Sequence, residues 1–171
     1  MIKNKIIVNT FNSKYEILIG INLINKLNKI LNSKLINSKK ILIVFDSKIP
    51  SKIINNLKNE IKVKTIFHKF YSNEKNKNQQ SVNKIIDVML KNNFNRNDCL
   101  IALGGGIVGD VSAFAASIFK RGLKFVNIPS TLLAQVDSSI GGKTGINSKF
   151  GKNLIGSFYQ PSLVIIDINF L

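Results

Sequence analysis

The stretch that most constrains the fold is residues 99–122, CLIALGGGIVGDVSAFAASIFKRG. A short apolar run leads directly into a cluster of glycines, and the small apolar residues that follow have a helical period. Gly104, Gly106 and Gly109 satisfy the pattern G-x-G-x-x-G between the expected strand and helix, which is the context that gives this pattern meaning. The free N–H groups at the start of such a helix favour a pyrophosphate. The stretch therefore predicts a strand–turn–helix unit whose helix start suits a pyrophosphate. The motif follows a late strand and no acidic residue lies ~20 residues downstream, so the ribose of a bound nucleotide would be held from elsewhere.

Strands and helices alternate along the rest of the chain. Two short β-rich runs, 5–8 and 15–19, predict a strand pair at an edge. Apolar runs then predict strands and amphipathic helices in turn. The strands are expected at 39–46, 63–70, 99–103 and 123–129, with a last strand within 158–167, and the helices at 21–31, 47–60 (with Pro50 near its start) and 81–93. Such alternation implies right-handed crossovers between parallel strands. We expect an α/β fold with a Rossmann-like, doubly wound, mainly parallel sheet and helices on both faces.

The basic charge raises the question of nucleic-acid binding. The chain has 25 Lys and Arg against 9 Asp and Glu, a formal net charge of +16. The basic residues are almost all lysines, scattered among Asn and Ile and not gathered in an arginine-rich stripe. A bias towards A+T-rich codons explains this excess without a ligand. We expect weak binding of polyanions at most and no specific nucleic-acid partner.

The remaining composition favours a cytoplasmic protein. No apolar run approaches the ~20 residues that a membrane-spanning helix needs, and the first residues lack the features of a secretory signal. The position of Cys99 in an apolar run predicts a buried thiol that packs as a small hydrophobic group. His68 has no second His or Cys near it at metal-ligand spacing, so we expect a strand residue and no metal ligand.

A second group of polar residues follows the glycine-rich turn. Asp137, Lys143, Lys152 and Asn153 lie close together in the sequence among several glycines. Because lysine binds phosphate as a point charge, this group suits a polyhydroxylated, phosphorylated ligand. The competing interpretation is that these are solvated charges in loops.

Three further residues have two open interpretations each. Asp46 ends the strand 39–46, where it can hold a ribose hydroxyl or cap the following turn. Ser130 or Thr131 can cap the helix expected after Pro129, or meet a phosphate there. The residues alone do not decide between these roles.

The motifs GGGIVGD, FKRG, PSTLLAQVDSSIGGKTGIN and GKNLIGSFYQP together closely resemble the 3-dehydroquinate synthase family of sugar phosphate cyclases. The resemblance is dense over 102–167 and fainter, though collinear, before it. It implies a lyase of the shikimate pathway of aromatic amino acid biosynthesis, which converts 3-deoxy-D-arabino-heptulosonate 7-phosphate to 3-dehydroquinate and phosphate. It also implies NAD and a divalent metal, zinc or cobalt, as cofactors. Residues 1–171 would then be a single NAD-binding α/β domain.

The resemblance assigns site residues by position. It implies that the catalytic and substrate-binding residues are Arg121, Asp137, Lys143 and Asn153, with Arg121 reaching the active site of a neighbouring subunit in a homodimer. Asn73 stands where the family usually has glycine. The residues implied to bind NAD are Asp46, Glu74, Lys77, Gly105, Gly106, Asp110, Ser130, Thr131, Lys152, Phe170 and Leu171.

The resemblance covers about half of the family's length. The family's C-terminal helical domain, which supplies one Glu and two His as metal ligands, would lie beyond residue 171, and we expect no metal ligand within this chain. We therefore expect the full reaction only together with a C-terminal half, for example a separate polypeptide. The alternatives are a catalytically inactive, truncated NAD-binding domain, a piece of a longer protein, and a related sugar phosphate cyclase.

Overall fold

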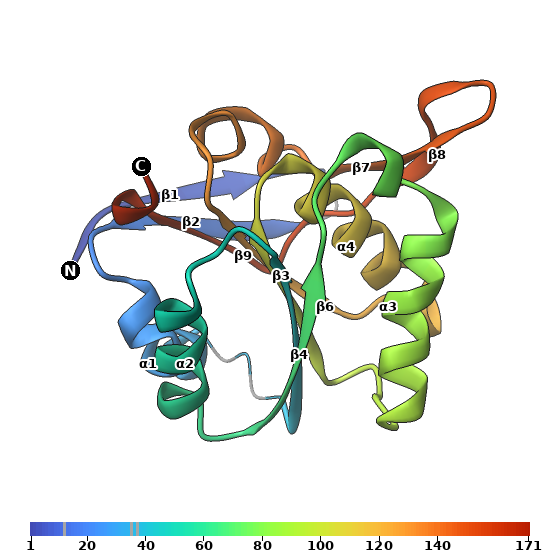
Figure 1. The fold of residues 1–171 in the computed structure, drawn as a ribbon. Helices are drawn as coiled ribbons and strands as arrows, with labels where there is room; N and C mark the ends of the chain where they lie inside the picture. Colours follow the sequence, from blue (N-terminus) through green and yellow to red (C-terminus); the bar gives the residue numbers. More distant parts are fainter. Residues whose placement is uncertain (12, 35, 37) are drawn as a thin grey trace.

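The computed structural model describes residues 1–11, 13–34, 36 and 38–171. Among these residues, seven strands form one sheet in the order β1-β2-β9-β6-β5-β3-β4 (Figure 1). Only β1 and β2 pair in antiparallel fashion, and every other neighbouring pair is parallel. The mainly parallel, doubly wound sheet expected from the sequence is confirmed. Its strands are β1 (Ile2–Asn9), β2 (Lys14–Gly20), β3 (Lys40–Asp46), β4 (Lys64–Phe70), β5 (Cys99–Gly104), β6 (Lys124–Pro129) and β9 (Leu163–Asp167).

Helices cover both faces of this sheet. Helices α1 (Leu27–Ser33) and α2 (Ser51–Glu60) pack on one face, and α3 (Gln79–Lys91) and α4 (Gly106–Ile118) pack on the other (Figure 1). The predicted helix over 21–31 is a short 3-10 turn followed by α1, so it begins later than expected. The short helical turns are η1 (Ile24–Lys26), η2 (Glu74–Asn76), η3 (Phe119–Arg121), the π-helical η4 (Ala134–Ser138) and η5 (Ile168–Phe170).

The central strands supply two cores, one on each face. In β3, Ile41 and Ile43 pack towards α1 and α2, while Leu42 and Val44 pack towards α3 and α4. All six residues of β5 are buried. Successive side chains of a strand point to opposite faces, so a central parallel strand must be apolar throughout. This is why the continuous apolar runs identified these strands correctly.

Helix α4 is buried on nearly all sides. It packs against β5 and β6 of the main sheet and also against a separate hairpin, β7 (Lys143–Ser148) and β8 (Gly151–Phe158). A helix enclosed by two layers needs small apolar residues all round, and VSAFAAS supplies them. The hairpin packs against α4 and projects from the molecule beyond the upper end of α3 (Figure 1).

The hairpin is the main difference from the sequence prediction, which placed these residues in loops. Glycine and polar residues dominate both strands, so no run of β-branched residues marks them. Ile146 pairs with Ile155 and is fully buried beside α4. A Cβ on Gly156 would lie 2.0 Å from the carbonyl oxygen of Thr144. The strands therefore pair because glycine permits a close approach and because α4 buries Ile146.

The burial predicted for Cys99 and the strand position predicted for His68 are confirmed. Cys99 is buried, and desolvation raises the pKa of its thiol to about 12. His68 is a half-buried residue of β4, where burial and, to a lesser degree, Lys84 lower its pKa. Within the described residues, no helix is long and apolar enough to cross a membrane.

Candidate active site

The predicted site begins where the central strands end. Strands β3, β5, β6 and β9 are parallel, so their carboxyl ends meet at one edge of the sheet, the place where ligands bind in open α/β sheets. At this edge Gly105 is the N-cap residue of α4 and, as a glycine, has no side chain to cap the first turn. The amino end of α4 therefore presents backbone N–H groups to a ligand.

Asp46 and Thr131 flank this glycine-rich turn. A Cβ on Gly104 would lie 3.2 Å from the Cβ of Asp46, which shows how closely the carboxylate residue approaches the turn. Asp46 Oδ1 accepts a hydrogen bond from the backbone N–H of Lys48 at 3.0 Å. The capping interpretation of Asp46 is thus realised, and its position at the strand end keeps the ribose interpretation open. Thr131 Oγ1 accepts from the N–H of Ala134 at 3.3 Å, which realises the predicted cap.

The turn has little room for side chains. An added Cβ would lie 3.3 Å from Thr131 Cγ2 at Gly105, and 2.9 Å from Ser138 Oγ at Gly106. Ser130 donates its backbone N–H to the carbonyl oxygen of Gly104 at 2.9 Å. The glycines are therefore required by close packing between the turn and the segment that follows β6.

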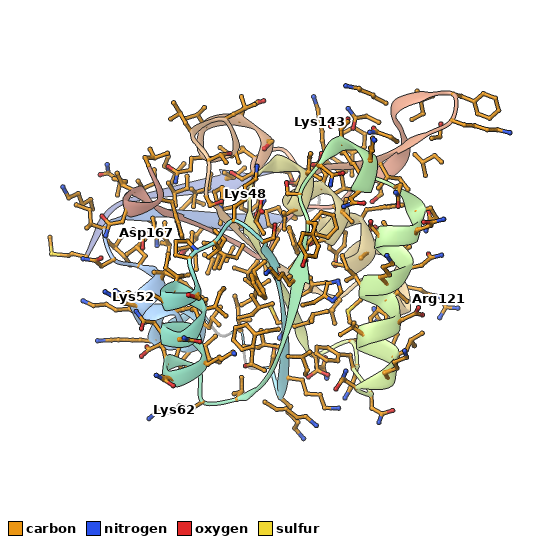
Figure 2. All side chains as sticks on the ribbon, viewed as in Figure 1. Lys48, Lys52, Lys62, Arg121, Lys143 and Asp167 are labelled. Atoms are coloured by element: carbon orange, nitrogen blue, oxygen red, sulfur yellow. The ribbon has the colours of Figure 1, made fainter. Side chains whose placement is uncertain are left out.

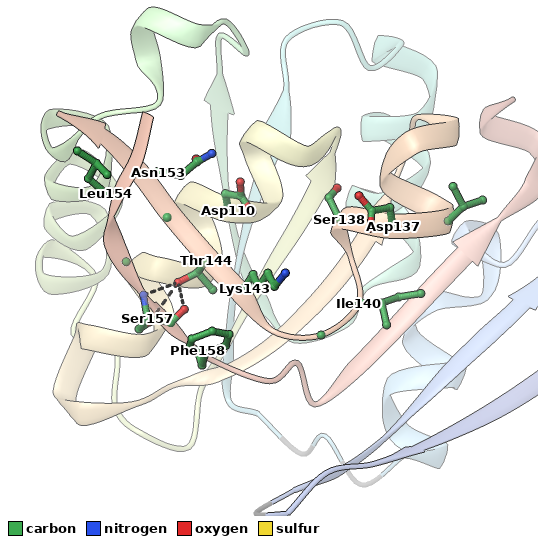
Figure 3. A pocket seen from close by; sticks show the side chains of 14 residues that line it. Asp110, Asp137, Ser138, Ile140, Lys143, Thr144, Asn153, Leu154, Ser157 and Phe158 are labelled. Atoms are coloured by element: carbon green, nitrogen blue, oxygen red, sulfur yellow. Dashed lines mark hydrogen bonds between the residues drawn. The ribbon is translucent and has the colours of Figure 1, made fainter. Parts of the chain in front are cut away.

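A cleft of about 750 Å³ opens between α4, the η4 turn and the hairpin. Asp110, Asp137, Lys143 and Asn153 line it (Figure 3). Asp110 belongs to the first turns of α4, Asp137 to η4, Lys143 to the start of β7 and Asn153 to β8. Three of the four substrate-binding residues implied by the resemblance thus surround one cleft, with Asp110 at its wall.

Lys77 connects α4 to the hairpin. Its Nζ donates to Asp110 Oδ2 at 2.5 Å and to Asn153 Oδ1 at 2.6 Å. The Lys77 side chain is only 9% exposed and that of Asp110 20% exposed. Burial raises the pKa of Asp110, and the ion pair with Lys77 opposes that rise. The pair therefore compensates two charges that are largely removed from water.

Glu74 and Lys152 lie nearer to solvent. The carboxylate of Glu74 accepts a hydrogen bond from Asn147 Nδ2 at 2.8 Å and lies 3.7 Å from Lys152 Nζ. The hydrogen bond from Asn147 is the main cause that lowers the pKa of Glu74, and Lys152 and Lys77 add to it. Lys152 is 74% exposed.

Arg121 lies away from this cleft. It follows α4 in η3, with a left-handed backbone (φ 65°), and lines a separate groove with Arg96, Lys124 and Tyr159. Figure 2 shows Arg121 well separated from Lys143. Within one chain, the structure does not bring Arg121 to the other residues that the resemblance implies for substrate binding.

Phe170 and Leu171 follow β9 at the carboxyl edge of the sheet. Phe170 is partly buried against the core beneath α1 and α2, whereas Leu171 is exposed. Neither residue lines the cleft. The structure therefore places both near the end of β9 and outside the cleft.

Sequence reasoning missed Ser138, Thr144 and Asn147. Ser138 and Thr144 line the cleft, and Thr144 Oγ1 bonds to the backbone of Ser157 on the opposite strand. Asn147 contacts both Glu74 and Asn153. Their only signal in the sequence is their place inside the densest motif, SSIGGKTGIN.

The described residues do not fit a catalytic metal. No three of their His, Cys, Asp and Glu side chains are grouped so that they could hold an ion. A catalytic zinc site needs about three protein ligands.

Comparison with known proteins gives the family. Residues 67–171 match the family model described as 3-dehydroquinate synthase N-terminal. The chain belongs to the 3-dehydroquinate synthase family. The 3-dehydroquinate synthase of Pelagibacter ubique is 60% identical over 98% of this chain and 46% of its own length. That of Blochmanniella floridana is 42% identical over 100% of this chain and 47% of its own length. The chain thus spans about half the length of the 3-dehydroquinate synthases it matches.

Solved structures of sugar phosphate cyclases share the fold. A 2-deoxy-scyllo-inosose synthase complexed with carbaglucose-6-phosphate, NAD+ and Co2+ has a TM-score of 0.89 at 23% identity, covering 98% of this chain and 46% of that protein. The 2-epi-5-epi-valiolone synthase of Streptomyces hygroscopicus, with NAD+ and Zn2+ bound, has a TM-score of 0.83 at 26% identity, covering 95% and 45%. These likenesses agree with the Rossmann-like sheet seen in this member of the 3-dehydroquinate synthase family.

Proposed function

We propose that residues 1–171 form the NAD-binding half of a 3-dehydroquinate synthase, a lyase that converts 3-deoxy-D-arabino-heptulosonate 7-phosphate to 3-dehydroquinate and phosphate. The observation that carries this proposal is the single cleft where Asp137, Lys143 and Asn153 surround Asp110. These residues combine groups that can bind hydroxyls with a group that can bind phosphate, and they lie beside the glycine-rich turn between β5 and α4. A phosphorylated, polyhydroxylated substrate and a dinucleotide both need this combination.

NAD fits the edge of the sheet at the glycine-rich turn. The uncapped amino end of α4 suits the pyrophosphate, and Gly105 and Gly106 leave room for close backbone approach. Asp46 would hold the adenosine ribose, while Ser130 and Thr131 would meet the cofactor from the segment after β6. When bound, NAD accepts and returns a hydride at a substrate hydroxyl. The other residues proposed to contact it are Glu74, Lys77, Asp110, Lys152, Phe170 and Leu171.

The substrate would lie in the cleft. Lys143 is exposed at the cleft, so its ammonium group is free to neutralise a phosphate or carboxylate. Asp137 and Asn153 would accept and donate hydrogen bonds to hydroxyls. Arg121 would serve the cleft of a neighbouring subunit in a homodimer, since it is remote from the cleft of its own chain.

The cleft is open to solvent on the side away from α4 and the hairpin. Large apolar side chains that line it are exposed, including Val136 (65%), Leu154 (62%) and Phe158 (81%). Exposed apolar groups of this kind mark a surface that another structure covers. We propose that the second half found in the longer relatives, in the same or a separate polypeptide, covers this surface. It would also supply the metal ligands, and the metal would polarise the reacting hydroxyls.

Calorimetry and a phosphate-release assay test this function. The chain should bind NAD and the heptulosonate phosphate, and Lys143→Met should weaken the second affinity by about 10- to 100-fold, as for a lost hydrogen bond to a charged group. Phosphate release should require an added polypeptide with the second half of the Pelagibacter ubique relative. Lys149→Met, at an exposed hairpin-tip position outside the cleft, is the control.

Two outcomes would favour the alternatives. Binding of NAD without phosphate release under any complementation would indicate an inactive NAD-binding domain. Turnover of a different sugar phosphate would indicate a related cyclase, the class of the solved neighbours. The 60% identity to a 3-dehydroquinate synthase favours the heptulosonate substrate.

A further inference from the structure

Asn147 occupies an irregular position in the β7–β8 hairpin. Ile146 pairs with Ile155 and Ser148 pairs with Gly151, so the register shifts between them and Asn147 alone faces residues 152–154. A bulge of this kind leaves backbone groups of the longer strand without ladder partners. Asn147 Oδ1 accepts one of them, the backbone N–H of Asn153, at 3.0 Å.

This hydrogen bond acts on a residue with an unusual backbone. Asn153 has a left-handed conformation (φ 56°), which few residues other than Gly and Asn adopt readily. Its side chain lines the cleft, and its Oδ1 accepts from Lys77 Nζ at 2.6 Å. The bond from Asn153 N–H to Asn147 therefore fixes the backbone that aims the Asn153 amide at the cleft.

The other half of the Asn147 amide contacts the opposite side of the site. Its Nδ2 donates to Glu74 Oε1 at 2.8 Å, and its backbone N–H donates to the carbonyl oxygen of Lys77 at 2.8 Å. The hydrogen bond from Asn147 also keeps the pKa of Glu74 low, which favours its ionised form. Asn147 thus joins the Glu74–Lys77 segment to Asn153 in β8.

We propose that Asn147 is a positioning residue that sets the orientation of Asn153 in the cleft and holds the Glu74–Lys77 segment against the hairpin. The effect of Asn147 on substrate binding rests on the proposed function, in which Asn153 contacts the substrate. An amide suits this role since it accepts and donates at once. An aspartate would accept from Asn153 but could not donate to Glu74, and an alanine would do neither.

Amide hydrogen exchange of the full chain tests the positioning. Asn147→Ala should speed exchange of the Asn153 N–H by about five- to tenfold, the effect of losing one net hydrogen bond. Asn147→Asp should keep that N–H protected, while the pKa of Glu74, followed by carboxyl NMR, should rise in both variants. Asn83→Ala, on the exposed face of α3, is the control, and urea unfolding checks that each variant is folded. Unchanged exchange at Asn153 in Asn147→Ala, or equally fast exchange in Asn147→Asp, would overturn the proposal.

Binding of the heptulosonate phosphate separates this proposal from the proposed function. In the presence of NAD, Asn147→Ala should weaken binding by about tenfold, which corresponds to ~1.4 kcal/mol. Equal affinities of Asn147→Ala and the unaltered chain would overturn the role of Asn147 in the cleft. If the unaltered chain binds no sugar phosphate, the proposed function fails, and the exchange of the Asn153 N–H alone decides whether Asn147 positions that residue.

Discussion

Lys77 Nζ lies 2.5 Å from Asp110 Oδ2, and this pair joins the turn after β4 to the first turns of α4. Both groups are largely withdrawn from water, so each depends on the other for compensation of its charge. The same ammonium group reaches Asn153 on the hairpin. Three segments that are distant in the sequence therefore meet at one cation.

Removal of this cation should destabilise the fold and the site together. We expect Lys77→Met to lower the free energy of unfolding by about 1–3 kcal/mol, because Asp110 loses its charged partner while remaining mostly buried. Urea unfolding measures this change. The matched control is Lys75→Met, two residues away and exposed, which should change stability by less than about 0.5 kcal/mol. Equal effects of the two substitutions would contradict the importance of the Lys77 pair.

The raised pKa of Asp110 predicts a pH dependence of stability. Burial makes the folded protein hold the Asp110 proton more tightly than the unfolded chain, where the pKa is near 3.8. Its contribution therefore favours folding below about pH 3.8 and is lost as the pH rises through the raised value. Asp110→Asn does not titrate, so the unfolding free energy of the unaltered chain minus that of Asp110→Asn should fall as pH rises from 3.5 to 7. Urea unfolding across this range measures it, and a difference that grows with pH would refute the assignment.

Gly156 should be essential to the hairpin. A Cβ there would lie 2.0 Å from the Thr144 carbonyl oxygen and 2.8 Å from the Cα of Gly145, both backbone atoms that cannot move aside cheaply. We expect Gly156→Ala to cost about 1–3 kcal/mol of stability and to increase hydrogen exchange in β7 and β8. Gly141→Ala is the comparison: its φ of +88° strains an alanine, but nothing lies within 4 Å. A larger loss in Gly141→Ala would show that backbone strain outweighs the clash.

Cys99 should be inert in the folded protein. Its thiol is buried and its pKa is raised to about 12, so almost no thiolate exists at pH 8. Iodoacetamide should leave the native chain unmodified, and intact mass should show one added carbamidomethyl group after unfolding in urea. Rapid modification of the native chain would mean that β5 opens readily.

The sequence predicts the main sheet well because its central strands are apolar on both faces. The runs around Ile43 and Ile101 are continuously apolar, as expected for strands that are buried on both faces. The glycines directly after β5 mark the tight turn into α4. Asp137, Lys143 and Asn153 could also be grouped in advance, since they lie in one short, glycine-rich motif. The close approach of Asp46 to Gly104 follows from the register of parallel strands.

The sequence does not predict contacts that depend on packing between distant segments. The hairpin forms because α4 covers Ile146, which no local pattern reveals. Lys77 lies in a polar run that looks solvated, yet α4 and β8 bury it. Asn147 is one of many asparagines in the chain, and only the bulge beside Asn153 distinguishes it.

The position of β9 in the sheet has a consequence for how the chain folds. This strand lies between β2 and β6, so the amino-terminal hairpin joins the sheet only through residues near the other end of the sequence. The carboxylate of Asp167 reinforces this join by accepting the N–H groups of Asn22 and Ile24. Contacts between such remote residues form slowly, because the chain loses the entropy of closing a long loop before the new contacts stabilise it. During synthesis on the ribosome, β1 and β2 therefore pair with the rest of this sheet only after β9 has been made.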